Sequence, residues 1–457
     1  MKNNNESKVM ENVISLAKRR GFIFQGSEIY GGLAGTWDYG PLGVALKNNI
    51  RHLWWKRFVL DREDMFGFDA SILMNQNVWK ATGHAEGFAD PSVECGKCKR
   101  RFRADQVGTK ISDNVFELFP SCPNCKESGD LWKLAGNNVK QFNMMFETHV
   151  GATQDENSLS YLRPETAQGM FVNFKNILDS QHPKLPFGMA QVGKAFRNEI
   201  APRDFLFRAR EFEQMEIEYF VHPDNWQDTF NSFVKEVHAF VGDIGLTKEN
   251  LHENEISEAD RAFYSKRTID FEFDFPFGRK ELYGLAYRTD YDLKRHSEWS
   301  KVDLSYYDEE KKERFIPHCI EPSFGLDRTV LAVLCDAYRE EGDGEETRVY
   351  LKLDPKVAPY KVAVFPLLRN KPELVAKAEE IYKMIKKVIP EVIFDDNGNI
   401  GKRYRRQDEI GTPYCVAVDF ETIEKGTGVT IRDRDSGKQE RVVIDDLIES
   451  LSKRIRS

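Results

Sequence analysis

The sequence predicts an α+β fold whose centre is a largely antiparallel sheet. Two stretches show the two-residue alternation of a strand. In residues 212–221, Met215, Ile217 and Tyr219 share one face, while most side chains on the other face are polar. Residues 269–275 repeat the pattern with three phenylalanines on one face. Helical patterns lie between such strands, and this mixture favours an antiparallel-rich core.

Length and composition bound the class of protein. At roughly 150 residues per domain, the chain of 457 residues predicts two or three domains. No run approaches the ~18 apolar residues that span a bilayer, and the polar first residues lack the apolar stretch of a secretory signal. Four of the seven cysteines form two close pairs, a pattern that suits a reducing compartment. We therefore expect a cytoplasmic protein with no membrane partner.

The first predicted elements are two helices separated by a loop. Residues 7–21 have a helical pattern that stops at Gly21, and residues 30–39 are glycine-rich and looped. Pro41 then stands where a helix begins, since its missing N–H is not needed in the first turn. The apolar residues that follow at helical spacing are Leu42, Leu46, Ile50 and Leu53. We expect this second helix to face the core.

A separate insert over residues 91–140 is rich in cysteine, lysine and arginine. It contains two Cys-x-x-Cys pairs that 23 residues separate: Cys95 with Cys98, and Cys122 with Cys125. Two such pairs suit a tetrahedral Zn²⁺ site with four thiolate ligands. The alternatives are two reduced pairs without metal, or a redox pair.

Arginines and carboxylates concentrate at a predicted hairpin. Residues 196–199 read Phe-Arg-Asn-Glu, and residues 208–216 read Arg-Ala-Arg-Glu-Phe-Glu-Gln-Met-Glu. A plain hairpin needs only turn residues. Guanidinium groups match phosphate oxygens, whereas carboxylates match ammonium or amine groups. The pattern predicts a site for a nucleoside triphosphate beside a small amine, and a salt-bridged surface hairpin is the alternative.

Residues 320–328 (Ile-Glu-Pro-Ser-Phe-Gly-Leu-Asp-Arg) lead into an amphipathic helix. Gly325 allows the backbone to approach a ligand closely. Arg328 falls in the first helical turn, where the helix dipole disfavours a cation. A residue placed against this preference predicts a ligand anion nearby, unless Arg328 is paired with Asp327 or Glu321.

These segments resemble the three motifs of class II aminoacyl-tRNA synthetases. The helix that begins at Pro41 resembles motif 1, the arginine-rich hairpin motif 2, and residues 320–328 motif 3. The hairpin's last residues, together with residues 163–166, 281–282 and 287–290, resemble glycyl-tRNA synthetases of the homodimeric class IIa kind. The resemblance implies a class II antiparallel catalytic sheet, a homodimer formed through motif 1, and glycine–tRNA ligase activity.

In that reaction, glycine and ATP form glycyl-adenylate, and the glycyl group passes to the 3′ end of tRNA(Gly). The resemblance implies that Arg197, Glu199 and Arg328 are catalytic. It implies that Glu281 helps to hold Mg²⁺ on the ATP phosphates. The full set of implied ATP-binding residues is Arg197, Asn198, Glu199, Phe207, Arg208, Phe212, Glu281, Leu282, Gly325, Leu326, Asp327 and Arg328.

The same resemblance implies a glycine pocket in which Glu165, Glu216 and Glu321 surround the ammonium group. The complete implied set is Arg103, Glu165, Phe212, Glu213, Gln214, Met215, Glu216, Arg288, Glu321 and Ser323. Three carboxylates around a buried point make chemical sense only when a cation is present. An added methylene clashes in a filled pocket, so no editing domain is expected.

The pattern changes after Pro355, where short apolar strands alternate with helices. Residues 355–457 carry 20 Lys and Arg against 17 Asp and Glu, on a chain whose net charge is −8. A mildly basic tail on an acidic body favours contact with RNA, although ordinary charge variation explains it equally well. Residues 401–413 contain four cations and Tyr404, and they resemble a class IIa anticodon-binding domain.

The predicted domains are the first part of the catalytic core (1–90), the zinc-binding insert (91–140), the rest of the core (141–345) and the anticodon-binding tail (355–457). A non-catalytic relative, either an RNA binder or a polymerase accessory subunit on the same scaffold, is the main alternative. A sister class IIa enzyme for another small amino acid is the second. Residues 84–87 (His-Ala-Glu-Gly) do not supply the HIGH signature of class I synthetases.

Overall fold

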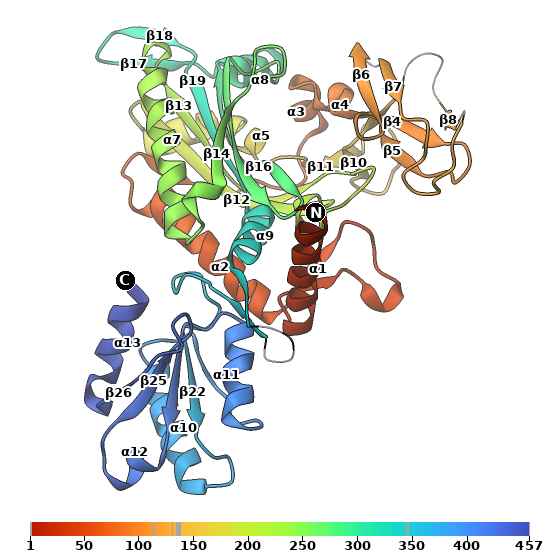
Figure 1. The fold of residues 1–457 in the computed structure, drawn as a ribbon. Helices are drawn as coiled ribbons and strands as arrows, with labels where there is room; N and C mark the ends of the chain where they lie inside the picture. The colour runs from red at the N-terminus through yellow and green to blue at the C-terminus, as the bar shows by residue number, and fades with distance from the viewer. Residues whose placement is uncertain are drawn as a thin grey trace.

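The computed structural model describes residues 2–112, 115–129, 131–133, 139–342, 344 and 347–456 (Figure 1). Parts of the predicted insert and the predicted core boundary at residue 345 lie outside the described residues, as does residue 457 of the tail. Among the described residues, no helix has both the length and the apolar character needed to cross a membrane.

A seven-stranded sheet forms the centre of the described structure. Its strand order is β14 (Leu251–Glu255), β15 (Arg267–Phe275), β16 (Gly278–Thr289), β19 (His318–Gly325), β13 (Glu211–Val221), β12 (Phe187–Phe196) and β3 (Met65–Gly67). Every neighbouring pair is antiparallel except β12 with β3. The predicted α+β class with an antiparallel-rich core is confirmed.

One face of the sheet packs on three long helices, α2 (Pro41–Trp55), α7 (Trp226–Asp243) and α9 (Leu326–Ala337). The apolar side of β13 meets buried side chains of all three helices. Pro41 begins α2 as predicted, and α1 (Lys2–Arg20) also contacts α9. Each fully buried large side chain contributes about 1.5–3 kcal/mol on leaving water, so this face carries most of the core.

The opposite face of the sheet is only partly covered by helices. The short helices α5 (Ala167–Phe171), α6 (Phe174–Gln181) and α8 (Tyr291–Ser300) enclose a smaller apolar cluster over β12, β13 and β19. Polar side chains of β13, β16 and β19 occupy the rest of that face. The two-residue alternation along β13 therefore separates the core from the polar surface.

The cysteine-containing strands lie to one side of the central sheet, next to β10 and β11 and away from the tail (Figure 1). Helices α3 (Gln76–Ala81) and α4 (His84–Gly87) lead into this region. Its strands are β4 (Ala89–Cys95), β5 (Arg101–Arg103), β6 (Gly108–Ser112), β7 (Val115–Leu118), β8 (Trp132–Lys133) and β9 (Lys140–Asn143). Only small apolar clusters support these strands.

Four two-stranded ribbons complete the body of the structure. They pair β1 (Ile23–Gln25) with β2 (Trp37–Tyr39), β10 (Phe146–His149) with β11 (Leu159–Leu162), β17 (Tyr306–Asp308) with β18 (Glu313–Phe315), and β20 (Tyr338–Glu341) with β21 (Arg348–Leu351). The end of the glycine-rich stretch predicted as a loop is therefore strand β2.

The tail forms its own five-stranded sheet, in the order β23 (Val392–Phe394), β22 (Val362–Pro366), β24 (Tyr414–Val418), β25 (Val429–Asp433) and β26 (Gln439–Val442). Its helices are α10 (Pro372–Lys386), α11 (Ile400–Glu409), α12 (Phe420–Glu424) and α13 (Leu447–Arg456). The alternation of short apolar strands with helices that the sequence predicts after Pro355 is present.

The cationic stretch of the tail, residues 401–413, is mostly helix α11. Two of its four cations make contacts that stabilise the fold. Arg403 is buried and donates to the backbone oxygens of Pro366 and Gly398. Arg406 pairs with Asp395 at 2.8 Å. Only Lys402 and Arg405 of the four are exposed. Arg403 and Arg406 are therefore engaged within the tail itself.

Candidate active site

A cavity on the polar face of the sheet collects most of the residues predicted to bind ATP. It lies between the ends of β12, β13, β16 and β19 and the start of α9. The predicted residues that line it are Arg197, Glu199, Phe207, Arg208, Phe212, Glu213, Gln214, Glu281, Leu282, Ser323, Gly325, Asp327 and Arg328. Leu206 and Ala209 line it as well. Segments distant in sequence thus form one site.

Arg197 follows directly after the last residue of β12 and lies between two aromatic rings. Its guanidinium carbon is 5.3 Å from the centre of the Phe212 ring and 5.4 Å from that of Phe88. Its Nε donates to the backbone oxygen of Pro164 at 3.1 Å. These contacts hold the guanidinium while leaving most of its donors available to a phosphate.

Glu199 and Arg208 form an ion pair across the hairpin, with Arg208 Nε 2.7 Å from a Glu199 carboxylate oxygen. Both residues line the cavity. Arg103, predicted at the glycine pocket, instead donates to Asp90 at 2.7 Å and to Asp105 at 2.9 Å. The structure therefore places Arg103, at the end of β5, in a salt-bridged group with Asp90 and Asp105, and Arg103 is not among the residues that line the cavity.

Arg328 lies at the other end of the cavity, in the first turn of α9. Its Nη1 is 3.1 Å from a carboxylate oxygen of Glu281, and its guanidinium lies 4.4 Å from the centre of the Phe207 ring. Arg328 therefore pairs with Glu281, and not with Asp327 or Glu321, the partners that the sequence offered as the alternative to a ligand anion. Burial and repulsion from Glu281 raise the pKa of nearby Asp270 to about 7, so this end of the cavity has carboxylates suited to a divalent cation.

Asp327 links three elements beneath the cavity. Its carboxylate accepts from the Tyr39 hydroxyl at 2.5 Å and from the Glu213 backbone N–H at 2.6 Å. Lys47 pairs with the Glu213 carboxylate and lies 4.1 Å from the centre of the Tyr39 ring. Asp327 therefore fixes the start of α9 against β2 and β13, which positions Arg328 one residue later.

The alternation of β13 divides the predicted glycine-binding residues between two faces. Gln214 and Glu216 point toward the polar pocket, where both contact Thr166. Met215 is fully buried in the core on the other face, and the Glu213 side chain is directed to Lys47. The side chains of Met215 and Glu213 therefore point away from those of Gln214 and Glu216, because adjacent residues of a strand face opposite ways.

Two residues of the implied ATP-binding set, Asn198 and Leu326, do not line the cavity with their side chains. The Asn198 backbone N–H donates to the Met144 oxygen at 2.7 Å, and Asn198 is not among the residues that line the cavity. Leu326 is fully buried in the core below it. Both lie within one residue of side chains that do line the cavity.

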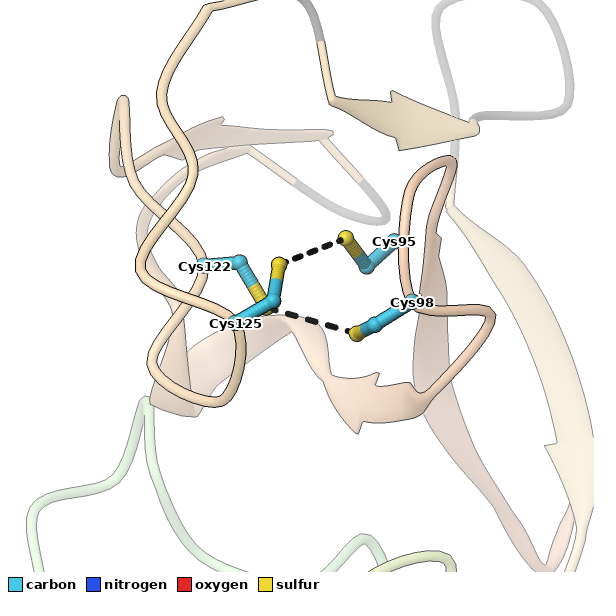
Figure 2. A group of neighbouring side chains, drawn as sticks. All are labelled: Cys95, Cys98, Cys122 and Cys125. Carbon is cyan, nitrogen blue, oxygen red and sulfur yellow. Dashed lines mark hydrogen bonds between the residues drawn. The ribbon is translucent and has the colours of Figure 1, made fainter.

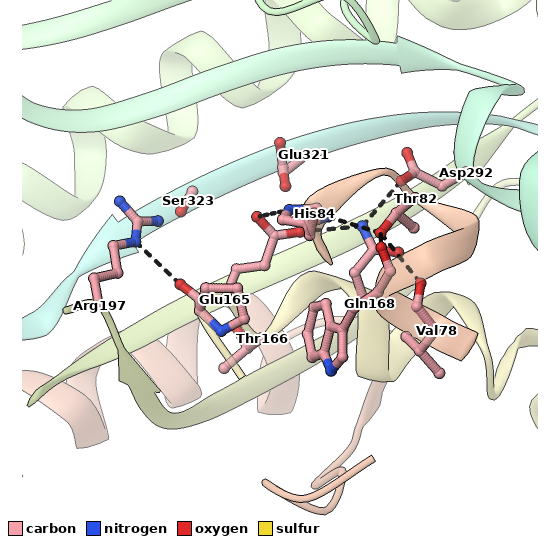
Figure 3. A network of polar contacts seen from close by, with 12 residues as sticks. Val78, Thr82, His84, Glu165, Thr166, Gln168, Arg197, Asp292, Glu321 and Ser323 are labelled. Carbon is pink, nitrogen blue, oxygen red and sulfur yellow. Dashed lines mark hydrogen bonds and ion pairs between the residues drawn. The ribbon is translucent and has the colours of Figure 1, made fainter. Parts of the chain in front are cut away.

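The remaining glycine-pocket residues meet in a buried polar network (Figure 3). Arg288 Nη1 is 2.7 Å from Glu321, and the Ser323 hydroxyl donates to Glu216 at 2.9 Å. Glu165 lies next to these groups. Three carboxylates thus converge where the family resemblance implies an ammonium group.

The charges in this pocket are not balanced. Burial raises the pKa of Glu321 to about 8; Arg288 opposes the shift, and Glu216 and Glu165 add to it. Burial and then Glu165 raise the pKa of Glu216. Burial also acts to raise the pKa of Glu165, yet His84 holds it well below its usual range. A small cation between these carboxylates would relieve their repulsion.

Several residues of the pocket were not predicted from the sequence. Gln168 donates to Glu165 and to Asp292, both at 3.0 Å (Figure 3). Asp292 in turn accepts two hydrogen bonds of 2.8 Å from Arg288. The Tyr264 ring lies 3.9 Å from the Arg288 guanidinium. Arg288 lies near the end of strand β16 and Asp292 near the start of helix α8, so no helical spacing in the sequence could have indicated the pair.

The four paired cysteines converge as predicted (Figure 2). Their sulfur atoms all lie within 4.8 Å of one another, with Cys95 and Cys125 sulfurs 3.9 Å apart and Cys98 and Cys122 sulfurs 3.8 Å apart. Zinc–sulfur bonds of about 2.3 Å in a tetrahedron place the sulfurs about 3.8 Å apart. The donor set therefore fits Zn²⁺.

Fold and site together define a class II aminoacyl-tRNA synthetase. The family described as "tRNA synthetase class II core domain (G, H, P, S and T)" matches residues 146–337. The family described as "Anticodon binding domain" matches residues 361–454.

Curated relatives narrow the assignment. A glycine–tRNA ligase of Clostridium tetani (strain Massachusetts / E88) is 48% identical, with 98% of this chain and 99% of that protein covered. One of Caldanaerobacter subterraneus subsp. tengcongensis is 47% identical, with 98% of each chain covered. One of Borreliella afzelii (strain PKo) is 49% identical, with 96% of each covered. The chain belongs to the glycine–tRNA ligase family.

Proposed function

We propose that this enzyme activates glycine with ATP and transfers the glycyl group to tRNA(Gly). The observation that carries the proposal is the junction of two sites: the arginine-lined cavity ends at Ser323, and Ser323 donates to Glu216 of the carboxylate pocket. A carboxylate pocket beside a polyphosphate site suits a small zwitterion that reacts with a nucleotide.

Adenylate formation needs charge stabilisation more than a protein nucleophile. The glycine carboxylate attacks the α-phosphorus of ATP, the new P–O bond forms, and pyrophosphate leaves with the electrons of the broken bond. Arg197 would hold the α-phosphate, because its guanidinium is already fixed by Pro164 and two aromatic rings. A fixed cation stabilises the charge that develops around phosphorus without reorganising.

Arg328 and Glu281 would stabilise the pyrophosphate leaving group. Arg328 would bind the terminal phosphate, after exchanging its contact with Glu281 for phosphate oxygens. Glu281 would then be free to hold Mg²⁺ on the ATP phosphates, with Asp270 close by. Glu199 and Arg208 would contact the adenosine and the terminal phosphates, and Phe212 would stack on the adenine.

Selection of glycine would follow from the small size of the carboxylate pocket. Glu165, Glu216 and Glu321 would contact the ammonium group, with Arg288 and Ser323 closing the pocket. Glu216 lies within a strand that is paired on both sides, so it cannot retreat from a larger side chain. An added methyl group would clash there.

The four cysteines of the insert would hold a structural Zn²⁺. A closed Cys₄ site supplies folding free energy rather than catalysis. We propose that the insert contacts the acceptor end of the tRNA, because its strands lie beside the Glu199 and Arg208 end of the cavity. Excision of the insert with unchanged tRNA affinity would contradict this role.

We divide the chain into the first part of the catalytic core (1–90), the insert (91–140), the rest of the core (141–345) and the tail (355–457). In this division the tail would be the domain that binds the anticodon. Lys402 and Arg405 are the exposed cations of α11 and the best candidates for phosphate contacts. Replacing both by alanine should raise the KM for tRNA and lower its salt dependence while glycine activation stays unchanged. Replacing the exposed pair Lys383 and Lys387 on and after α10 is the matched control.

A class IIa homodimer is also part of the proposal. Ile29 and Tyr30 are 89% and 87% exposed, and Leu33 and Val44 nearby are exposed as well. A cluster of exposed apolar residues next to α2 is typical of a subunit interface. A reducing, cytoplasmic location suits the seven cysteines, all of which are free.

ATP–pyrophosphate exchange with each amino acid in turn tests the proposal. Exchange with glycine alone is expected. Exchange with another amino acid would keep the class and overturn the pocket assignment. No exchange by folded enzyme with Mg²⁺ would favour the non-catalytic RNA binder.

A further inference from the structure

We propose that His84 is a positioning residue of the amino-acid pocket, which fixes the Glu165 carboxylate that receives the substrate ammonium group. This inference rests on the proposed function, because it assigns His84 a role in glycine binding. His84 begins the short helix α4, directly before the cysteine-containing strands, and its sequence context gave no indication of the role.

His84 is enclosed and directed at Glu165. Its Nε2 lies 3.4 Å from a carboxylate oxygen of Glu165, and both side chains are almost fully buried. The rings of Trp79 and Phe88 each have centroids 5.6 Å from the imidazole. The imidazole thus contacts two aromatic rings. One of its nitrogens faces the Glu165 carboxylate (Figure 3).

The hydrogen bonds of Thr82 indicate where the imidazole protons lie. The Thr82 hydroxyl is 2.7 Å from His84 Nδ1 and also reaches the Val78 backbone oxygen at 3.2 Å. If Thr82 donates to Val78, it accepts from Nδ1–H, and Nε2 must also carry a proton to face a carboxylate. If Thr82 donates to Nδ1, the neutral imidazole carries its proton on Nε2. Either arrangement directs an N–H at Glu165.

Glu165 is therefore held from two sides. Gln168 donates to one carboxylate oxygen at 3.0 Å, and His84 faces the other. These contacts keep the carboxylate in one orientation, and the low pKa of Glu165 means that it stays ionised in a buried site. Glu216 and Glu321, whose pKa values are raised, have no imidazole among their contacts. Glu165 would thus be the pocket carboxylate most ready for an ammonium ligand.

The test compares wild-type enzyme with His84→Ala, His84→Gln and Thr82→Val in pyrophosphate exchange, with KM measured separately for glycine and ATP. Loss of a hydrogen bond to a charged group corresponds to about a 10- to 100-fold change in equilibrium. His84→Ala should raise the KM for glycine by about that factor, with the KM for ATP nearly unchanged. His84→Gln should recover most of the loss, because its amide can donate to Glu165, and Thr82→Val should have a smaller effect than His84→Ala.

The control is His252→Ala, since His252 also faces a carboxylate, Asp274 at 2.7 Å, but at the exposed edge of the sheet. An unchanged KM for glycine in His84→Ala would overturn the inference, and so would equal rises in both KM values without rescue by His84→Gln. Absence of glycine exchange in the wild-type enzyme would instead overturn the proposed function, and this inference with it.

Discussion

The guanidinium of Arg288 lies 2.7 Å from the Glu321 carboxylate, and both groups are buried. Asp292 already holds two other nitrogens of Arg288, so Arg288 is shared between two carboxylates. Glu165 and Glu216 lie close by without an arginine of their own. The pocket thus has excess negative charge when empty, and this excess gives it a measurable dependence on pH.

The KM for glycine should rise as the pH falls below about 8. Glu321, whose pKa is about 8, is protonated below that value in the empty pocket, and a protonated carboxyl attracts an ammonium group less strongly. The rise should approach tenfold per pH unit at most, roughly 1.4 kcal/mol. Exchange kinetics between pH 6 and 9 would measure it. A flat profile, or an equal change in the KM for ATP, would contradict the prediction.

Arg197→Ala should lower kcat for adenylate formation by about 10²–10³-fold, the loss expected for one preorganised donor in a transition state. Arg197→Lys should recover only part of this, because an ammonium group cannot bind phosphate as a planar fork. Thermal unfolding should be nearly unaffected, because the Arg197 side chain donates a single hydrogen bond, to Pro164, in the described structure, and its backbone hydrogen bonds remain in the variant. Normal exchange by Arg197→Ala would remove this residue from the reaction centre.

Asp408→Ala should destabilise the junction between the tail and the body by about 3–5 kcal/mol. Asp408 is buried and accepts from Arg348 at 2.9 Å and from Arg432 at 2.8 Å. Its loss removes the carboxylate partner of Arg432 and leaves Arg348, among the described residues, paired with Glu341 alone. Denaturant unfolding of the tail would measure the change, with Asp445→Ala at a tail surface position as the comparison. We expect glycine activation to persist, and equal stability of the two variants would refute the assignment.

Purified protein should contain one zinc ion per chain, and Cys98→Ser should lose it. The insert has few buried apolar side chains, so loss of the metal should make its strands sensitive to proteolysis. Elemental analysis and limited proteolysis would follow the two effects, with Cys335→Ser as the control that keeps its metal. Metal-free wild-type protein with a protease-resistant insert would contradict the zinc assignment.

Much of the fold could be predicted because the informative patterns are local. Alternation along residues 212–221 identified both the strand and its core face, and Pro41 marked the start of α2. The cysteine spacing likewise predicted a cluster that the structure contains. Each of these patterns lies within a short stretch of sequence, and backbone geometry alone converts it into structure.

The sequence could not indicate contacts between side chains and partners that lie far apart along the chain. In the sequence, Arg403 resembles a phosphate-binding cation. In the structure its guanidinium is buried and donates a hydrogen bond to the backbone oxygen of Pro366. Arg328 pairs with Glu281 on another strand rather than with its neighbour Asp327. The cysteine-containing strands separate His84 from Glu165 along the chain, so no local pattern could have connected the two. Such pairings depend on how the elements pack.

Glu216 has a further consequence for translational accuracy. It lies on a strand with hydrogen-bonded neighbours on both sides, paired with Gln191 on β12 and with Ser323 on β19. A pocket floor of this kind cannot widen without breaking the ladder of the central sheet. Discrimination between amino acids would then need no proofreading step and no moving gate. Attachment of a wrong amino acid to the tRNA should become frequent only under conditions that begin to unfold the enzyme.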